Sequence, residues 1–249
     1  MGDIPKIFFD TNIYINYFWA LLRTIESKSR GEEPELKGRL AKDKELFDKY
    51  ENYEFELFWS IWGYWEFKQK IHEQLYQRKC VLYGYMPKEY HEAKENVPDL
   101  TIDELELFSN TTETLLNSIP HEKRNFQNIN ESEIHRMVTF GCGFMDSVLF
   151  YHAYKNDCDF FVTRDEEFIS KISAFCLIQK IKTQVVKPDF MLSRLKEGIC
   201  WSCGGETKIE HEEHEIGSRP DDEPLGRRLI DYSECKGCGK KIVLNEETI

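Results

Sequence analysis

The stretch Ile7-Phe8-Phe9-Asp10-Thr11-Asn12-Ile13 determines how the N-terminal part of this 249-residue chain is expected to fold. Its first three residues form a short apolar run that stops at polar residues, which is typical of a strand buried on both faces of a sheet. Similar runs follow at residues 56–60, 159–163 and 183–186, with helical patterns between them. Strands that alternate with helices favour an α/β domain with a parallel sheet flanked by helices.

Helical patterns are predicted over residues 14–28, 40–53 and 61–79. Another helix is predicted to begin close to Asp146, where apolar residues follow at helical spacing. The intervening stretch 86–130 is polar and helix-prone, and prolines punctuate it. We therefore expect a helical insertion between the second and third strands.

Acidic residues stand where functional groups of a parallel sheet usually gather, beyond the carboxyl ends of its strands. Asp10 and Asp165 each come directly after an apolar strand, and Glu66 and Asp146 fall in helices that can face the same edge. Four carboxylates in one place repel one another unless cations neutralise them, and Mg²⁺ prefers such oxygen ligands. The alternative is that these are ordinary surface acids, since the chain contains 45 Asp and Glu residues.

The same residues lie in motifs that resemble, in the same order, those of the PIN-domain nuclease family. The first is residues 7–13, the second runs from Ser60 to Glu66, the third is Phe144-Met145-Asp146-Ser147-Val148-Leu149, and the fourth is Phe161-Val162-Thr163-Arg164-Asp165. The ending Val185-Val186-Lys187-Pro188-Asp189-Phe190-Met191 is similar to the family's last strand and exit. The resemblance covers residues 4–192 approximately.

The resemblance implies a PIN-like sheet and a set of catalytic residues. Asp10, Glu66, Asp146 and Asp165 would bind a catalytic Mg²⁺ or Mn²⁺, while Thr11, Asn12 and Thr163 would orient the carboxylates or water by hydrogen bonds. Because all four acidic positions are filled, we expect an active enzyme that hydrolyses RNA. The helical insertion, at about residues 86–140, is longer than compact members of the family need.

Two cysteine pairs define a second, smaller unit at residues 198–249, after a domain that covers residues 1–197. Cys200 and Cys203 form one Cys-x-x-Cys knuckle, Cys235 and Cys238 form the other, and a glycine follows each knuckle. This spacing predicts a closed, structural Cys₄ zinc ribbon rather than a redox dithiol. The 31 residues between the knuckles are expected to form a loose loop that contains His211 and His214. Trp201 is expected to be buried, with base stacking as the alternative. The four isolated cysteines are expected to fill the core: Cys80, Cys142, Cys158 and Cys176.

The net charge of −12 argues against a protein that holds nucleic acid through an overall positive field. Phosphate contacts must then come from local cations, of which Arg164, Lys68 and Lys70 are the main candidates. Further candidates are Arg78, Lys79, Lys123, Arg124 and Arg136. The chain begins without a secretory leader pattern and has no apolar run of membrane-spanning length, so a cytoplasmic protein is expected.

The sequence favours a metal-dependent endoribonuclease with a C-terminal zinc ribbon. RNA is the expected partner, and a protein partner or inhibitor and pairing into a homodimer are open alternatives. Two other functions also stay open. One is a non-catalytic RNA- or protein-binding adaptor in an RNA-processing complex, and the other is a structure-specific DNA nuclease.

Overall fold

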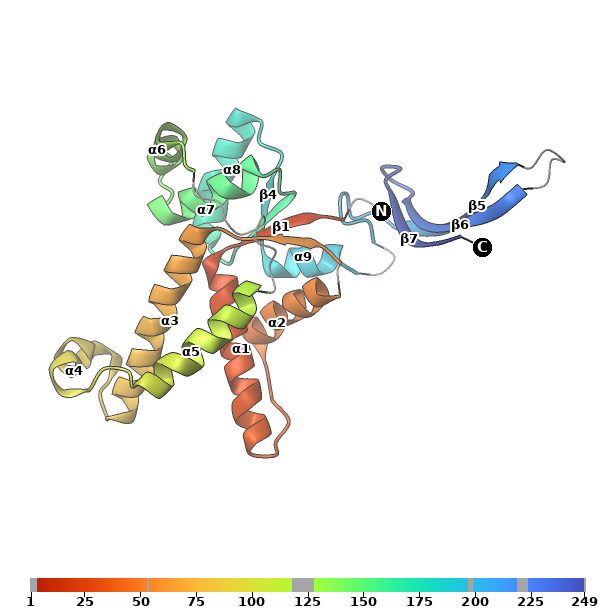
Figure 1. The fold of residues 1–249 in the computed structure, drawn as a ribbon. Helices are drawn as coiled ribbons and strands as arrows, with labels where there is room; N and C mark the ends of the chain where they lie inside the picture. The colour runs from red at the N-terminus through yellow and green to blue at the C-terminus, as the bar shows by residue number, and fades with distance from the viewer. Residues whose placement is uncertain (1–3, 53, 118–127, 197–198, 219–223, 249) are drawn as a thin grey trace.

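The computed structural model describes residues 4–52, 54–117, 128–196, 199–218 and 224–248. They form a mixed α/β structure with a four-stranded parallel sheet, followed by a separate three-stranded antiparallel sheet (Figure 1). The expected boundary at residue 197 lies outside the described residues, as do the candidate cations Lys123 and Arg124.

The parallel sheet has the strand order β2-β1-β3-β4. The strands are β1 (Lys6–Phe9), β2 (Glu56–Phe58), β3 (Phe160–Val162) and β4 (Gln184–Val186). The central strand β1 pairs in parallel with β2 and β3, with Phe8 opposite both Phe58 and Phe161. All four carboxyl ends therefore meet at one edge of the sheet.

Both faces of the sheet are covered, which explains the continuous apolar strands. Phe9 and Val162 point to one face, where they pack with residues of α1 (Thr11–Ser29), α2 (Gly38–Glu51) and α9 (Pro188–Arg194). Phe8 and Phe161 point to the other face, and their cluster includes residues of α6 (Glu131–Thr139), α7 (Phe144–Lys155) and α8 (Glu166–Gln179). The period-two alternation along each strand thus divides the core into two layers.

The second strand is shorter than the sequence predicts because Ser60 caps the next helix. Helix α3 spans Ile61–Leu82, and Ser60 Oγ accepts a 3.1 Å hydrogen bond from the Gly63 amide. A residue that caps a helix stops the strand before it. Similarly, α1 begins three residues earlier than its apolar pattern indicates, because the chain turns directly from β1 into the helix at Asp10.

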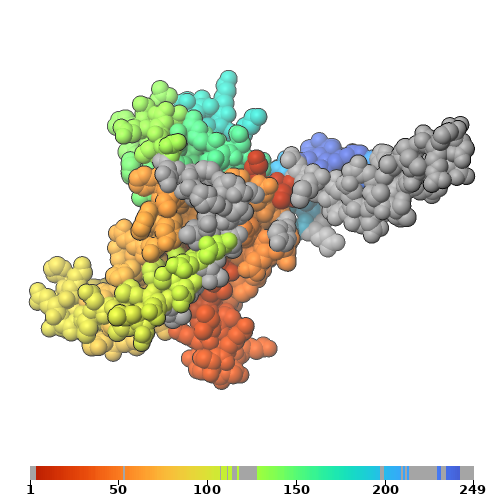
Figure 2. Space-filling model, viewed as in Figure 1, coloured from red at the N-terminus to blue at the C-terminus, as the bar shows by residue number. Residues whose placement is uncertain are grey.

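The predicted insertion is helical where the structure describes it. It contains a 3₁₀ turn at Pro87–Glu89, α4 (Tyr90–Asn96), α5 (Ile102–Asn117) and α6. Figure 1 shows α4 near the C-terminal end of α3, far from the sheet, and the space-filling view shows this part standing out from the body (Figure 2).

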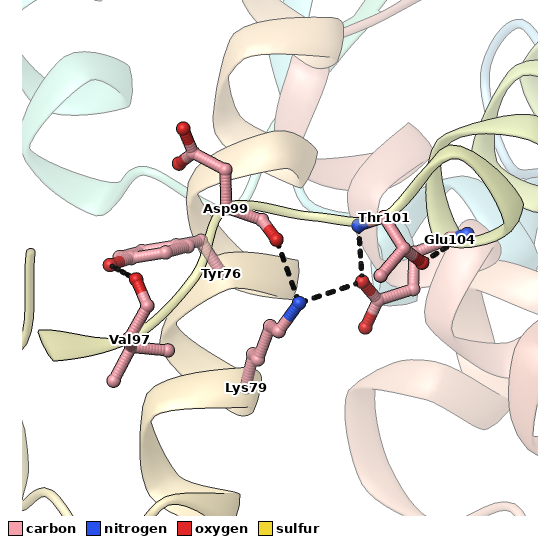
Figure 3. A network of polar contacts seen from close by, with 6 residues as sticks. All are labelled: Tyr76, Lys79, Val97, Asp99, Thr101 and Glu104. Carbon is pink, nitrogen blue, oxygen red and sulfur yellow. Dashed lines mark hydrogen bonds and ion pairs between the residues drawn. The ribbon is translucent and has the colours of Figure 1, made fainter.

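A polar network attaches α5 to α3 (Figure 3). Buried Lys79 donates a 2.7 Å hydrogen bond to the Asp99 carbonyl and a 3.1 Å hydrogen bond to Glu104 Oε2. The same carboxylate accepts from the Thr101 amide at the start of α5. Lys79 was a candidate phosphate contact in the sequence, but here its ammonium serves this internal network.

The stretch between the cysteine knuckles is a hairpin where the structure describes it, so the expected loose loop is wrong. Strands β5 (Thr207–Ser218) and β6 (Pro224–Cys235) pair in antiparallel fashion, and β7 (Lys241–Thr248) pairs with β6. His211 and His214 lie on β5. Charged residues are depleted in strands, so the composition of these segments did not indicate strands. In the structure, pairing along the hairpin satisfies their backbone hydrogen-bonding groups.

Three of the four isolated cysteines are buried as expected. Cys80, Cys142 and Cys158 are at most 4% exposed, and half-buried Cys176 packs against the α7–α8 side of the core. Burial raises the pKa of the Cys142 and Cys176 thiols to about 11. These thiols are therefore protonated at neutral pH and serve as small apolar side chains.

Across the described ranges, no helix has both the length and the apolar character that a membrane span needs.

Candidate metal centres

Asp10 is the most deeply buried of the four predicted carboxylates. It follows β1, its side chain is almost fully buried, and its amide donates a 3.0 Å hydrogen bond to the Val162 carbonyl of β3. Oδ2 accepts hydrogen bonds from Thr163 Oγ1 at 2.6 Å and from Asn12 Nδ2 at 3.0 Å. Thr163 and Asn12 therefore orient this carboxylate, as predicted.

Glu66 reaches the same edge of the sheet from α3. Its Oε2 accepts a 2.5 Å hydrogen bond from Thr11 Oγ1, and Thr11 directly follows Asp10 in the chain. Its Oε1 pairs with Lys70 Nζ at 2.7 Å, one helical turn further along α3. The sequence predicted Lys70 as a phosphate contact, and the structure places its ammonium among the carboxylates.

Asp146 stands in the first turn of α7, where a carboxylate is stabilised by the positive end of the helix. Gly143 precedes it, and a Cβ atom at Gly143 would lie 2.4 Å from Asp146 Oδ2. A side chain at position 143 would therefore oblige the Asp146 carboxylate to shift from its present place.

Asp165 follows β3 and begins α8. Its Oδ1 accepts a 2.9 Å hydrogen bond from the Phe168 amide, and its own amide donates to Thr163 Oγ1 at 3.1 Å. The Thr163 hydroxyl thus connects Asp10 and Asp165, since it donates to the first and accepts from the second.

The electrostatics show that these carboxylates act on one another. Burial raises the pKa of Asp10 from 3.8 to about 6; the Thr163 hydrogen bond opposes this shift, while Asp146 and Glu66 add to it. Burial, Glu66 and Asp165 raise the pKa of Asp146, and Lys70 opposes them. Burial alone would lower the pKa of Lys70, but its hydrogen bond to Glu66 and the charges of Glu66, Asp10 and Asp146 raise it. Three of the four carboxylates therefore act on the Lys70 ammonium.

The donor atoms of this set are of the kind that hard divalent cations bind. Carboxylate oxygens are the ligands that Mg²⁺ and Mn²⁺ prefer, and the mutual repulsion that raises the pKa of Asp146 is what such a cation relieves. The ligand atoms are more widely spaced than in the cysteine site, because no three of the described carboxylates have oxygens that all lie within 4.8 Å of one another. Mg²⁺ usually retains several waters, which suits a set of this width.

Arg164, the leading candidate for a phosphate contact, already has a partner inside the protein. Its guanidinium makes a bidentate ion pair with the fully buried carboxylate of Asp43 on α2, with Nε 2.9 Å from Oδ2. Asn16 donates a third hydrogen bond to Asp43, at 2.7 Å. Sequence reasoning gave Asp43 no role, because nothing local distinguishes it from other acids on an amphipathic helix.

Lys68 lies on the face of α3 that also carries Trp65. The Lys68 ammonium is 5.4 Å from the ring centroid of Tyr64 and 5.7 Å from that of Trp65. Trp65 is 59% exposed. Sequence reasoning identified Lys68 and missed Trp65, although Trp65, Lys68, Gln69 and His72 recur at the spacing of one helix face.

The second site is the predicted set of four cysteines. The Sγ atoms of Cys200, Cys203, Cys235 and Cys238 all lie within 4.8 Å of one another, so they can hold a metal ion such as zinc. Hydrogen bonds from the backbone amides of Cys238 and Gly237 lower the pKa of Cys235 to about 6, although burial opposes them. At Cys238 the Lys240 backbone hydrogen bond lowers the pKa, but hydrogen bonds with the other three thiols and burial outweigh it and raise the pKa to about 11. A thiol that ionises readily is a better metal ligand.

The two knuckles have matching backbone turns. Gly204 and Gly239 both have positive φ, at 78° and 70°, and their amides donate to the carbonyls of Cys200 and Cys235 at 2.8 and 2.9 Å. The left-handed conformation explains why glycine follows each knuckle, as predicted.

The first knuckle packs against the parallel-sheet domain. Trp201 is only 7% exposed, its ring centroid is 6.1 Å from that of Phe160 on β3, and it belongs to the same core cluster as β1. The Lys240 ammonium covers it at 3.6 Å from the ring centroid. The expectation of a buried tryptophan is confirmed.

Comparison with known proteins gave no match to any family model, curated protein or solved structure.

Proposed function

We propose that this protein is a metal-dependent endoribonuclease with its active site at the carboxyl ends of the parallel strands. The observation that carries the proposal is the proximity of Asp10, Glu66, Asp146 and Asp165. Besides burial, Asp146 and Glu66 raise the pKa of Asp10, Glu66 and Asp165 raise that of Asp146, and Lys70 opposes both shifts. The order of the motifs, which resembles that of PIN-domain nucleases, supports the same reading.

In this proposal, each group has a distinct task. A bound Mg²⁺ or Mn²⁺ supplies a water of lowered pKa and neutralises charge on the phosphodiester. Asp10 and Asp146 hold that ion from the ends of β1 and α7, while Glu66 and Asp165 complete the ligand set. Thr163, Asn12 and Thr11 fix the carboxylates before substrate arrives, which limits the reorganisation needed during the reaction.

The four cysteines have a structural task in this proposal. A closed Cys₄ zinc site leaves no open position for chemistry, and metal binding stabilises a small unit that buries little core of its own. The hairpin and knuckles would then form a zinc ribbon anchored to the catalytic domain by Trp201. Metal analysis should find about one zinc ion per chain.

The test is cleavage of single-stranded and structured RNA with Mn²⁺ at low ionic strength, with flap DNA assayed in parallel. Asp10→Asn and Asp146→Asn should abolish cleavage while circular dichroism stays unchanged, and Asp103→Asn, an exposed acid on α5, should cleave normally. Cleavage that persists in EDTA or in both variants would contradict the proposal. Preferential cutting of flap DNA would instead support a DNA nuclease, and saturable partner binding without any cleavage would support an adaptor.

A further inference from the structure

We infer that the face of α3 beside Glu66 binds an unpaired nucleobase of the substrate, with Trp65 as its stacking platform. This inference rests on the proposed function for its choice of ligand. The observations that support it do not involve the carboxylates. They are an exposed aromatic ring, a neighbouring cation and a groove.

The first observation is the exposure of Trp65. The indole is 59% exposed in the second turn of α3, although its neighbours Tyr64 and Phe67 contribute to the core. An indole left in solvent keeps its flat face available for a stacking contact. Base stacking on such a ring is favourable whatever the base, because every base has a π-face.

The second observation is the charge beside that ring. The Lys68 ammonium lies near the Tyr64 and Trp65 rings, and no carboxylate pairs with it among the described residues. In a chain of net charge −12, an available cation next to an exposed indole is a local exception. A base on Trp65 would place its phosphate within reach of Lys68.

The third observation is a groove between α3 and α5 with a volume of about 710 Å³. Trp65, Lys68, Gln69 and His72 line one wall, and apolar side chains of α5, including Ile102 and Leu105, line the other. Gln69 and His72 offer hydrogen-bonding groups to base edges, while Glu106 adds one carboxylate.

The position of the groove relates it to the carboxylates. Gln69, in one wall of the groove, follows Glu66 by three residues, so that wall adjoins the face of α3 that carries Glu66. A strand stacked on Trp65 thus passes beside Glu66 and Lys70. This arrangement favours unpaired RNA, because paired bases are already stacked within a helix.

The test measures binding separately from cleavage, with labelled oligouridine of about 12 nucleotides in EDTA at low ionic strength. Trp65→Ala should weaken binding about tenfold, and Trp65→Phe should retain most of the affinity. Tyr83→Ala removes an aromatic ring of similar exposure at the far end of α3 and should bind as the wild type does. Lys68→Ala should lower the salt dependence of binding by about one counterion.

The nature of the ligand is tested with an abasic oligonucleotide of the same length and with a fully paired duplex. Both should bind the wild type more weakly than oligouridine, and Trp65→Ala should make little difference to either. The inference is overturned if Trp65→Ala binds normally, if abasic or duplex ligands bind as tightly as oligouridine, or if the wild type does not bind. Because these measurements need no turnover, Trp65-dependent binding without Mn²⁺-dependent cleavage would overturn the proposed nuclease alone. Cleavage with Trp65-independent binding would overturn the stacking site alone.

Discussion

The hydroxyl of Thr163 donates a 2.6 Å hydrogen bond to Oδ2 of Asp10, although the two residues are 153 positions apart in the chain. Each stands just beyond a strand, and β1 and β3 are neighbours in the sheet. The contact is fully buried and is the strongest influence that opposes the raised pKa of Asp10. Pairing of β1 with β3 therefore moderates the rise that burial imposes on the pKa of Asp10.

Removing that hydroxyl should weaken metal binding in a pH-dependent way. In Thr163→Val the pKa of Asp10 rises further, so at about pH 6 more of the carboxyl is protonated and unable to bind metal. We expect apparent Mn²⁺ affinity, followed by thermal stabilisation, to fall about tenfold at pH 6 and less at pH 8. Thr163→Ser keeps the hydroxyl and is the matched control. An equal loss at both pH values would contradict this account.

Asp10 should destabilise the metal-free protein at neutral pH. Its folded pKa of about 6 lies above the ordinary 3.8, so its contribution favours folding at low pH and is lost as the pH rises through about 6. The difference corresponds to about 3 kcal/mol. Without metal, Asp10→Asn should therefore be more stable than the wild type near pH 7.5 and lose the advantage near pH 4, as measured by urea unfolding in EDTA. Added Mg²⁺ should stabilise the wild type and not the variant. An Asn variant that is less stable at both pH values would refute the prediction.

Gly143→Ala should displace Asp146 without disturbing the helix. The backbone of Gly143 is extended, at φ −62° and ψ 149°, and alanine adopts it freely, but the new Cβ would stand 2.4 Å from Asp146 Oδ2. Cleavage and Mn²⁺ affinity should fall at least tenfold, as expected when a metal ligand loses its orientation. Phe144→Ala changes the next residue, which is 58% exposed, and serves as the control. Unchanged Mn²⁺ affinity in Gly143→Ala would show that Asp146 is not a ligand in this position.

Loss of the four-cysteine site should increase the solvent exposure of Trp201. Cys203→Ser removes one ligand, and the released knuckle should expose the indole that now packs near Phe160. We expect loss of bound zinc and a red shift of tryptophan emission, with far-ultraviolet circular dichroism dominated by the unchanged helices. Cys176→Ser, which changes a thiol in the parallel-sheet domain, should retain zinc and its emission. Full zinc content in Cys203→Ser would rule out this ligand set.

Lys79 should matter for stability and its neighbour Arg78 should not. Lys79→Ala leaves the Asp99 carbonyl and Glu104 without the buried ammonium (Figure 3), so the free energy of unfolding should fall by about 1–3 kcal/mol. Arg78 pairs with Glu26 between half-exposed side chains, and Arg78→Ala should change stability by about 0.5 kcal/mol or less. Chemical denaturation of both variants makes the comparison. Equal effects would mean that the network does not hold α5 against α3.

Much of the candidate site could be predicted because it depends on local patterns. Asp10 and Asp165 were found by their places after apolar runs, and parallel pairing then brings strand ends together. Glu66 was identified through its motif, and its contact with Thr11 follows from how α3 packs beside α1. The hairpin of β5 and β6 was missed because its strands are charged and their pairing is not a local property.

The alternation of strands and helices, the four acidic positions and the two cysteine knuckles could be read from the sequence, because each depends on spacing within a few residues. The partners of the charged side chains could not, because they come from elements that meet only in the folded protein. From the sequence, Arg164 was the leading candidate for a phosphate contact. In the structure, packing of α2 against the sheet domain brings Asp43 to it as an ion-pair partner. Lys70 likewise lies near the carboxylates because α3 begins just beyond the carboxyl end of β2. The physical reason is that a buried charge must find its counter-charge across elements distant in the chain, and helix packing rather than local pattern sets that geometry.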